Sequence, residues 1–142
     1  MMRWRMLTTS IAVWLLAGCG AAPRGPESIP MDRINCARCG MLISSDANAA
    51  QLQRPGEATR FYDDTGCLAA DPDARAQDAR RYVHLAAGRW ETTDAAWFAQ
   101  PPGVKTPMDY GVVAFATERE AQEAGGGPPR QWPAIVRAVE AP

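Results

Sequence analysis

Three features are scarce in this sequence: histidine, long apolar runs and an excess of basic residues. His84 is the only histidine among 142 residues. Apart from carboxylates, most of the potential metal ligands are therefore the sulfur atoms of cysteine and methionine. The apolar run from Ile11 to Ala17 is too short to span a bilayer as a permanent helix. The 15 basic and 16 acidic residues nearly balance, which gives no support to nucleic-acid binding.

The N-terminus has the order of residues expected of an export signal. Arg3 and Arg5 precede the apolar run, and small residues precede Cys19. The sequence Leu-Ala-Gly-Cys that ends at Cys19 resembles the bacterial lipobox, in which the cysteine becomes the lipidated first residue of the mature protein. We therefore expect a lipoprotein signal peptide over 1–18 and a periplasm-facing domain anchored to a bacterial membrane through acyl chains on Cys19. An ordinary signal peptide with a chance cysteine is the alternative, and it would leave an odd thiol.

A flexible stalk is expected after the lipidation site. Residues 19–30 contain Pro23, Gly25, Pro26 and Pro30, a composition typical of a linker. Removal of the signal takes two arginines from the 15 basic residues and leaves 13 against 16 acidic ones, a net charge of about −3. The mature chain is thus mildly acidic, and we expect no nucleic-acid partner.

Potential metal ligands are most concentrated in the sequence Cys36-Ala-Arg-Cys39-Gly40-Met41. It places two thiols and a thioether within six residues, and this is the soft ligand set that favours Cu(I). Gly40 has no Cβ, so the chain can turn tightly there and aim the sulfurs of Cys39 and Met41 at one point. An extended chain would also place these two side chains on one face. Both geometries predict a chelating pair.

Other candidate ligands lie outside this stretch. Met108 follows Pro107, whose fixed φ holds the chain rigidly in a turn, and His84 lies in an alternating segment where a solvent-facing position is the simpler interpretation. An oxidising compartment favours disulfides, yet the three thiols left after Cys19 cannot all pair with one another. Cys36 is therefore open to three roles: a second thiolate ligand, half of a disulfide with Cys39 or Cys67, or a spectator. Asp63 and Asp64 are interpreted as helix caps rather than as metal ligands.

The pattern of apolar and turn residues predicts an α+β fold. Strands are expected at 47–53, 59–63, 81–86, 89–92, 110–116 and 132–139, helices at 65–70 and 118–124, and a short helix or irregular crossing at 94–98. We group these elements into two small ββαβ-like units. The first, 31–87, carries the Cys-Gly-Met loop, and the second is 88–142. Neither unit is large enough to bury much core alone, so the two should pack together.

Several segments, taken in order, resemble the NosL family of lipoproteins, which are accessory factors of nitrous-oxide reductase assembly. They are Cys-Ala-Arg-Cys-Gly-Met-Leu-Ile at 36–43, Ala-Ala-Gln at 49–51, Phe-Tyr-Asp-Asp-Thr-Gly-Cys at 61–67, Tyr-Val-His at 82–84, Gly-Arg-Trp at 88–90 and Thr-Pro-Met-Asp-Tyr-Gly at 106–111. The resemblance implies a pair of ββαβ units. It also implies a Cu(I) chaperone, without enzymatic turnover, that supplies the copper–sulfur centre of that reductase. The implied partners are the reductase and its membrane maturation machinery, and the implied metal ligands are Cys39, Met41 and Met108.

Two other functions use the same residues. A thiol–disulfide oxidoreductase would use Cys36 and Cys39, but such motifs place the first thiol at a helix N-terminus, and here the motif follows a proline-rich stalk. A structural zinc site could use Cys36, Cys39, Cys67 and His84, which suits the coordination number of zinc. That site would leave Met41 and Met108 without a role.

Overall fold

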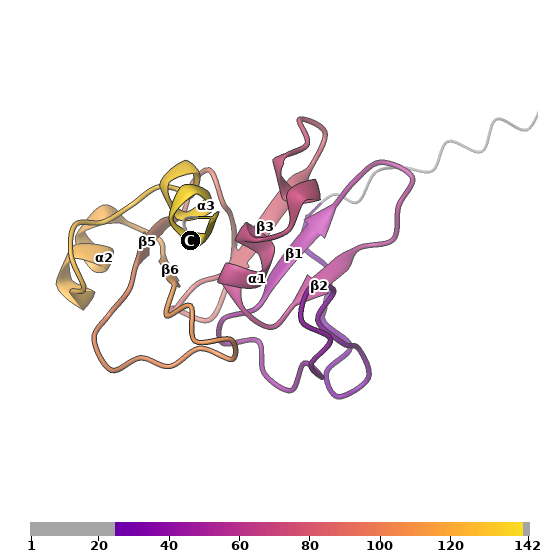
Figure 1. Ribbon diagram of the computed structural model, residues 1–142, viewed down its shortest axis with the longest axis horizontal. Helices are drawn as coiled ribbons and strands as arrows, with labels where there is room; N and C mark the ends of the chain where they lie inside the picture. Colours follow the sequence, from indigo (N-terminus) through magenta and orange to yellow (C-terminus); the bar gives the residue numbers. More distant parts are fainter. Residues whose placement is uncertain (1–24, 141–142) are drawn as a thin grey trace, which may run out of the picture.

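The computed structural model describes residues 25–140, so the expected signal peptide, Cys19 and the first part of the stalk lie outside the described residues. Two antiparallel sheets and three α-helices form the fold (Figure 1). The strands are β1 (Ala50–Gln53), β2 (Arg60–Tyr62), β3 (Arg80–His84), β4 (Trp90–Thr92), β5 (Trp97–Ala99) and β6 (Val113–Phe115). The helices are α1 (Thr65–Ala69), the 3-10 helix η1 (Pro72–Arg75), α2 (Glu118–Ala124) and α3 (Trp132–Glu140). Within these residues no helix combines the length and apolarity needed to cross a membrane.

The first half of the chain follows the sequence prediction closely. Strands β1 and β2 pair as an antiparallel hairpin around the turn at 54–57, with Gln51 opposite Phe61. Helix α1 begins directly after β2 because the Asp64 carboxylate accepts a hydrogen bond from the backbone N–H of Gly66 (2.7 Å), which satisfies one of the free donors at the helix N-terminus. All five residues of α1 are buried, so this short helix is fixed by its packing on β1 and β2.

The two sheets are joined rather than separate. The larger sheet has the order β2-β1-β3-β4, and the smaller contains β5 and β6. Strand β4, which we had grouped with the second unit, pairs with β3 through the tight turn at Gly88 and extends the first sheet. An isolated parallel bridge between Leu85 and Ala114 then links the end of β3 to β6. The α+β class is confirmed, and one apolar core runs through both halves.

Two elements differ from the sequence prediction. Residues 132–139, expected as a strand, form helix α3, because Trp132, Ile135, Val136 and Val139 recur at helical spacing and are buried or half-buried against the core. The crossing expected at 94–98 ends instead in strand β5, which pairs with β6 in the register Phe98 opposite Ala114. Both errors come from short apolar segments in which local residue preferences do not decide the structure.

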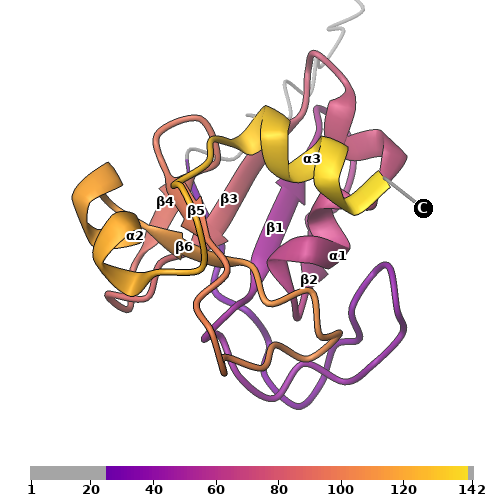
Figure 2. The ribbon, with the colours of Figure 1, turned by 60° about the vertical axis from the view of Figure 1, so that its left-hand side comes forward.

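The helices pack so that one end of the molecule is made of loops. Helices α1 and α3 contact each other on the same side of the larger sheet, and α2 packs on β5 and β6 (Figure 2). The loop that precedes β1 and the loop between β5 and β6 lie together at the lower end of both views (Figures 1 and 2). The first of these loops carries Cys36 to Met41, and the second carries Met108.

Candidate metal centre

The loop before β1 folds as a small hairpin that presents the sulfurs. Asn35 and Leu42 form an antiparallel bridge, and the backbone N–H of Cys36 donates to the carbonyl of Met41 (2.8 Å). The chain turns at Gly40, whose φ of 79° lies in the left-handed region that glycine adopts without strain. The hairpin is fixed to the edge of the larger sheet because the N–H of Ala37 donates to the carbonyl of Phe61 on β2 (2.8 Å).

This hairpin meets the start of α1 and creates a cluster of four potential ligands. The sulfurs of Cys36, Cys39 and Cys67 and a carboxylate oxygen of Asp63 all lie within 4.8 Å of one another. The three cysteines are free thiols. Cys36 and Cys67 are buried, whereas Cys39 is only partly covered. Among residues 25–140, this is the one group of three or more His, Cys, Asp or Glu side chains that could hold a metal ion together.

Asp63 is the acidic member of the cluster, and it is 4% exposed. Burial, together with the neighbouring Cys36 sulfur, raises the pKa of its carboxyl to about 6. The thiol of Cys39 lies 3.5 Å from Oδ1 and 3.6 Å from Oδ2, in position to donate to the carboxylate. Asp63 therefore accepts a hydrogen bond from the outermost thiol and can receive a proton near neutral pH.

The three thiols are not equivalent. A hydrogen bond from the Cys67 thiol, with further bonds from backbone N–H groups, holds the pKa of Cys36 well below its usual range. The same bond raises the pKa of Cys67, whose proton it uses, and burial raises the pKa of Cys39. In the metal-free site Cys36 is therefore the thiol that loses its proton most readily, and Cys39 and Cys67 hold their two protons more strongly. A metal ion that binds all three sulfurs must displace those two protons.

Two methionines, Met41 and Met108, are exposed on the loops that carry or adjoin residues of this cluster. Met41 follows the Gly40 turn directly and is 43% exposed. Met108 is 40% exposed, and its backbone N–H donates to Oδ2 of Asp64 (3.0 Å), the residue next to Asp63. One buried carboxylate thus caps α1 and also holds the Met108 loop against that helix. The cluster itself has two buried thiols, Cys36 and Cys67, and one partly exposed thiol, Cys39.

His84 is not part of the cluster. It lies at the end of β3, where its Nε2 is 3.6 Å from a carboxylate oxygen of Asp46 and its ring packs edge-on against Trp90 at a centroid distance of 5.1 Å. The fourth potential ligand beside the three thiols is a carboxylate oxygen of Asp63 instead. The ligand set that we considered for zinc is therefore not assembled with His84. The Cys36–Cys39 motif lies in a turn, not at the helix N-terminus that oxidoreductases of this type use.

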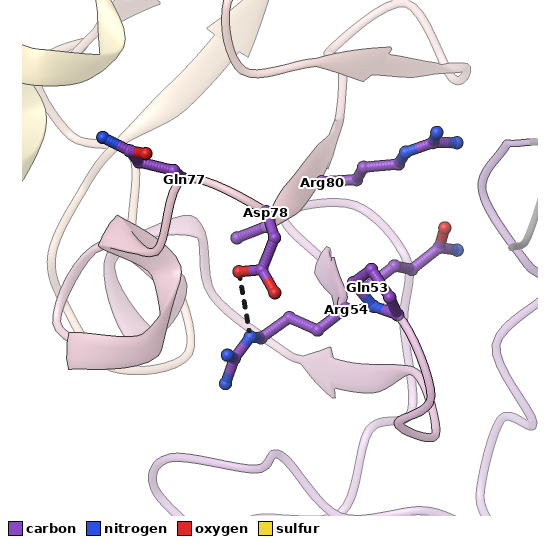
Figure 3. A pocket seen from close by; sticks show the side chains of 7 residues that line it. Gln53, Arg54, Gln77, Asp78 and Arg80 are labelled. Atoms are coloured by element: carbon purple, nitrogen blue, oxygen red, sulfur yellow. Dashed lines mark hydrogen bonds and ion pairs between the residues drawn. The ribbon is translucent and has the colours of Figure 1, made fainter.

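Hollows elsewhere on the molecule lie away from the thiols. One of about 320 Å³ is at the far end of β1, lined by Gln53, Arg54, Gln77 and Asp78 among others. Figure 3 shows Arg54 reaching Asp78 there, with the ion pair at 3.4 Å. A larger hollow of about 590 Å³ includes His84 and Asp46 and is otherwise lined mainly by apolar side chains. Neither hollow is lined by a cysteine.

Sequence reasoning missed Asp63 as a site residue and left Cys67 undecided. Asp63 and Asp64 were both interpreted as helix caps, and the structure divides the roles: Asp64 caps α1, while Asp63 faces the thiols. The available signal was that one helix needs one cap, which leaves the second carboxylate free. Cys67 reaches the cluster because α1 folds back over β1 and β2, a tertiary arrangement that spacing along the chain does not encode.

Comparison with known proteins identifies the fold. No family model matches the chain, and no curated protein matches it by sequence. The structure is similar to the crystal structure of the copper chaperone NosL from Shewanella denitrificans, with a TM-score of 0.69 and 20% sequence identity. The match covers 82% of this chain and 98% of the other. The two chains share a fold over nearly the full length of that protein.

Proposed function

We propose that this chain is a copper chaperone of the NosL type, which binds one Cu(I) ion at the thiol cluster and hands it to another protein. The observation that carries the proposal is the convergence of three free thiols within 4.8 Å, on a fold like that of a copper chaperone. Cu(I) is soft and accepts two to four thiolate or thioether ligands, which this site supplies. The carboxylate of Asp63 is a hard ligand, and we assign it to proton transfer rather than to the copper.

Cargo transfer needs ligands at the surface as well as ligands inside. Cys39 is the partly exposed thiol, and Met41 beside it is 43% exposed, so these two sulfurs can remain on the ion while a receiving protein attacks from solvent. Met108 is held close by the hydrogen bond to Asp64 and is our third surface ligand. Cys36 is assigned to the buried side of the ion. His84 has no part in the site as we propose it, because it lies outside the cluster, with its Nε2 3.6 Å from a carboxylate oxygen of Asp46.

The wider assignment follows from the sequence resemblance. We propose that lipid on Cys19 anchors the protein to a bacterial membrane with the domain facing the periplasm. The proposed recipient is nitrous-oxide reductase, reached through the membrane machinery that matures its copper–sulfur centre. The fold supports the chaperone assignment, and the client needs its own test: cells lacking this protein should produce reductase that is deficient in that centre, and added copper should partly restore it.

The direct test is an anaerobic Cu(I) titration of the full chain carrying Cys19→Ser, in competition with a chromophoric Cu(I) chelator. We expect one tightly bound Cu(I), and weaker binding of Zn(II). Cys39→Ser and Met41→Leu should each lower the Cu(I) affinity by about tenfold or more, equivalent to about 1.4 kcal/mol. His84→Gln is the matched control and should leave the affinity unchanged.

Three results would contradict the proposal. The reduced protein could fail to bind Cu(I), or it could bind equally well with residues 39 and 41 both replaced. Zn(II) could bind more tightly than Cu(I) and depend equally on Cys36 and Cys67, which would identify a structural zinc site. Rapid reduction of insulin disulfides by the metal-free protein would instead identify an oxidoreductase that uses Cys36 and Cys39.

A further inference from the structure

We propose that Cys36 and Cys67 form a reversible disulfide, and that this bond converts the metal site from a closed three-sulfur site into an open one. The proposal rests on the proposed function, because it concerns release of the same cargo. Its first basis is geometric. The sulfurs of Cys36 and Cys67 lie within 4.8 Å of each other, and both side chains are at least 97% buried. The third thiol, Cys39, points to the carboxylate of Asp63 instead.

Cys36 therefore has two possible partners, and the structure favours Cys67. A bond between Cys36 and Cys39 would close a loop of four residues inside a turn that backbone hydrogen bonds already define. A bond between Cys36 and Cys67 would join the hairpin to helix α1 and close a much longer loop. Because the loss of freedom in the unfolded chain grows with loop length, the longer bridge stabilises the folded state more. At equilibrium the buried pair is the one that we expect to be oxidised.

An oxidant reaches this pair through Cys39, since that sulfur is the one with solvent access. The oxidant is a disulfide compound of low molecular weight or an exposed protein disulfide. The thiolate of Cys39 attacks one sulfur of the oxidant, forms a mixed disulfide and releases one thiol. Cys36 then attacks the Cys39 sulfur and releases the second thiol. Finally Cys67 attacks Cys36 and frees Cys39.

The net exchange is balanced. Two protein thiols and one disulfide become one protein disulfide and two thiols, with two electrons passing to the oxidant and the two thiol protons carried away on the products. Each sulfur-to-sulfur transfer needs only a short movement, because the three sulfurs lie within 4.8 Å. Cys39 ends as it began, a free thiol beside Met41.

The consequence for copper follows from the ligand count. The reduced site offers three thiols, and the oxidised site offers Cys39 with the surface thioethers of Met41 and Met108. Loss of two thiolates weakens the hold on Cu(I) and leaves the remaining ligands exposed at the surface. Oxidation of the buried pair thus favours release of the ion to a receiver, and reduction restores the tight site.

The test uses the full chain with Cys19→Ser, metal-free and anaerobic, incubated with glutathione disulfide. We expect one of the three thiols to remain titratable, and mass spectrometry of the digested protein should show a Cys36–Cys67 bridge. Cu(I) affinity should fall at least tenfold on oxidation and recover after treatment with a phosphine reductant. In Cys67→Ser the mixed disulfide of glutathione with Cys39, or a Cys36–Cys39 bond, should accumulate. In Cys39→Ser oxidation should slow at least tenfold.

Several outcomes would overturn the inference. These are a stable Cys36–Cys39 bridge in the unmodified protein, three thiols that stay reduced, or an oxidised protein that binds Cu(I) as tightly as the reduced one. Failure of the reduced protein to bind Cu(I) at all would instead count against the proposed function. The two failures are distinguishable because the mapping of the disulfide needs no metal. A circular dichroism spectrum of Cys67→Ser identical to that of the parent chain would show that the variant is folded.

Discussion

At the scale of single residues, Asp63 is the side chain whose charge state most affects the metal-free protein. Its carboxyl is buried beside three sulfurs, and its pKa is raised to about 6. A carboxyl with a raised pKa in the folded state favours folding while it is protonated, and this advantage is lost as the pH rises through 6. Above that pH, a buried charge next to the Cys36 thiolate opposes folding.

We therefore predict that Asp63→Asn removes a pH dependence. The free energy of unfolding of the parent chain, relative to the variant, should decrease between pH 4 and pH 7 by up to about 3 kcal/mol, because one pKa unit corresponds to about 1.4 kcal/mol. Urea unfolding of both proteins at several pH values, reduced and metal-free, measures the difference. A difference that stays constant over this range would mean that the pKa of Asp63 is the same in the folded and the unfolded protein.

Asp64 has a different role, because its two oxygens serve two parts of the chain. One oxygen caps α1 at Gly66 (2.7 Å), and the other accepts from the N–H of Met108 (3.0 Å). In Asp64→Asn one oxygen remains for the cap, but an amide N–H₂ then faces the Met108 N–H, and two donors cannot pair. We expect a loss of about 1–3 kcal/mol in unfolding free energy.

The same variant tests whether Met108 binds copper. If it does, Asp64→Asn should weaken Cu(I) binding by about as much as Met108→Leu, and the double variant should show no further loss, since both remove one ligand. Competition with a Cu(I) chelator gives the three affinities. Independent, additive losses would show that Asp64 acts on the site by another route, and unchanged affinities would remove Met108 from the ligand set.

At the scale of elements, the loop between β5 and β6, which carries Met108, packs against α1 at Gly66. A Cβ added to Gly66 would overlap the ring of Tyr110, which lies directly against the helix backbone. We predict that Gly66→Ala destabilises the protein by about 1–3 kcal/mol through overpacking and displaces this loop. In a Tyr110→Ala background the same change should be neutral or stabilising by up to about 1 kcal/mol, because alanine is the better helix former. Chemical unfolding of the four proteins in this cycle gives the coupling.

If contacts other than Tyr110 on α1 hold the loop between β5 and β6 in place, the cycle should show no coupling. If Gly66→Ala costs the same with and without the Tyr110 ring, the contact between α1 and the loop is not what holds the loop in place. The Cu(I) affinity of Gly66→Ala provides a second measure, since displacement of the loop moves Met108. Its value should match that of Met108→Leu.

Elements also show where reading the sequence succeeds. The capping residue Asp64 and the helix expected at 118–124, which forms as α2, follow from local signals, and each produced the expected structure. The strand prediction for 132–139 was wrong because β-branched and aromatic residues suit a strand as well as a helix. The helix is selected only when Trp132 and Ile135 pack against the core. The turn at Gly40 was predictable from six residues, whereas the approach of Cys67 to Cys36 depends on how α1 packs.

At the scale of the whole molecule, bound copper should cross-link parts of the chain that are far apart in the sequence. The sulfurs of the cluster come from the hairpin before β1 and from α1, and α1 in turn packs on β1, β2 and α3. Ions that bind only the folded arrangement stabilise it by mass action. At free Cu(I) concentrations 100 times the Kd, the expected gain is about 2.7 kcal/mol.

We predict that saturating Cu(I) raises the Tm of the reduced Cys19→Ser chain by about 10 °C, given the sensitivity of Tm to free energy in domains of about this size. A chelator added in excess should return the Tm to the metal-free value. Cys67→Ser should show a smaller increase, because loss of that thiol leaves α1 unconnected to the ion. A full increase in Cys67→Ser would mean that the ion is held by the hairpin alone. Amide hydrogen exchange would then show protection in residues 36–43 but no change in α1.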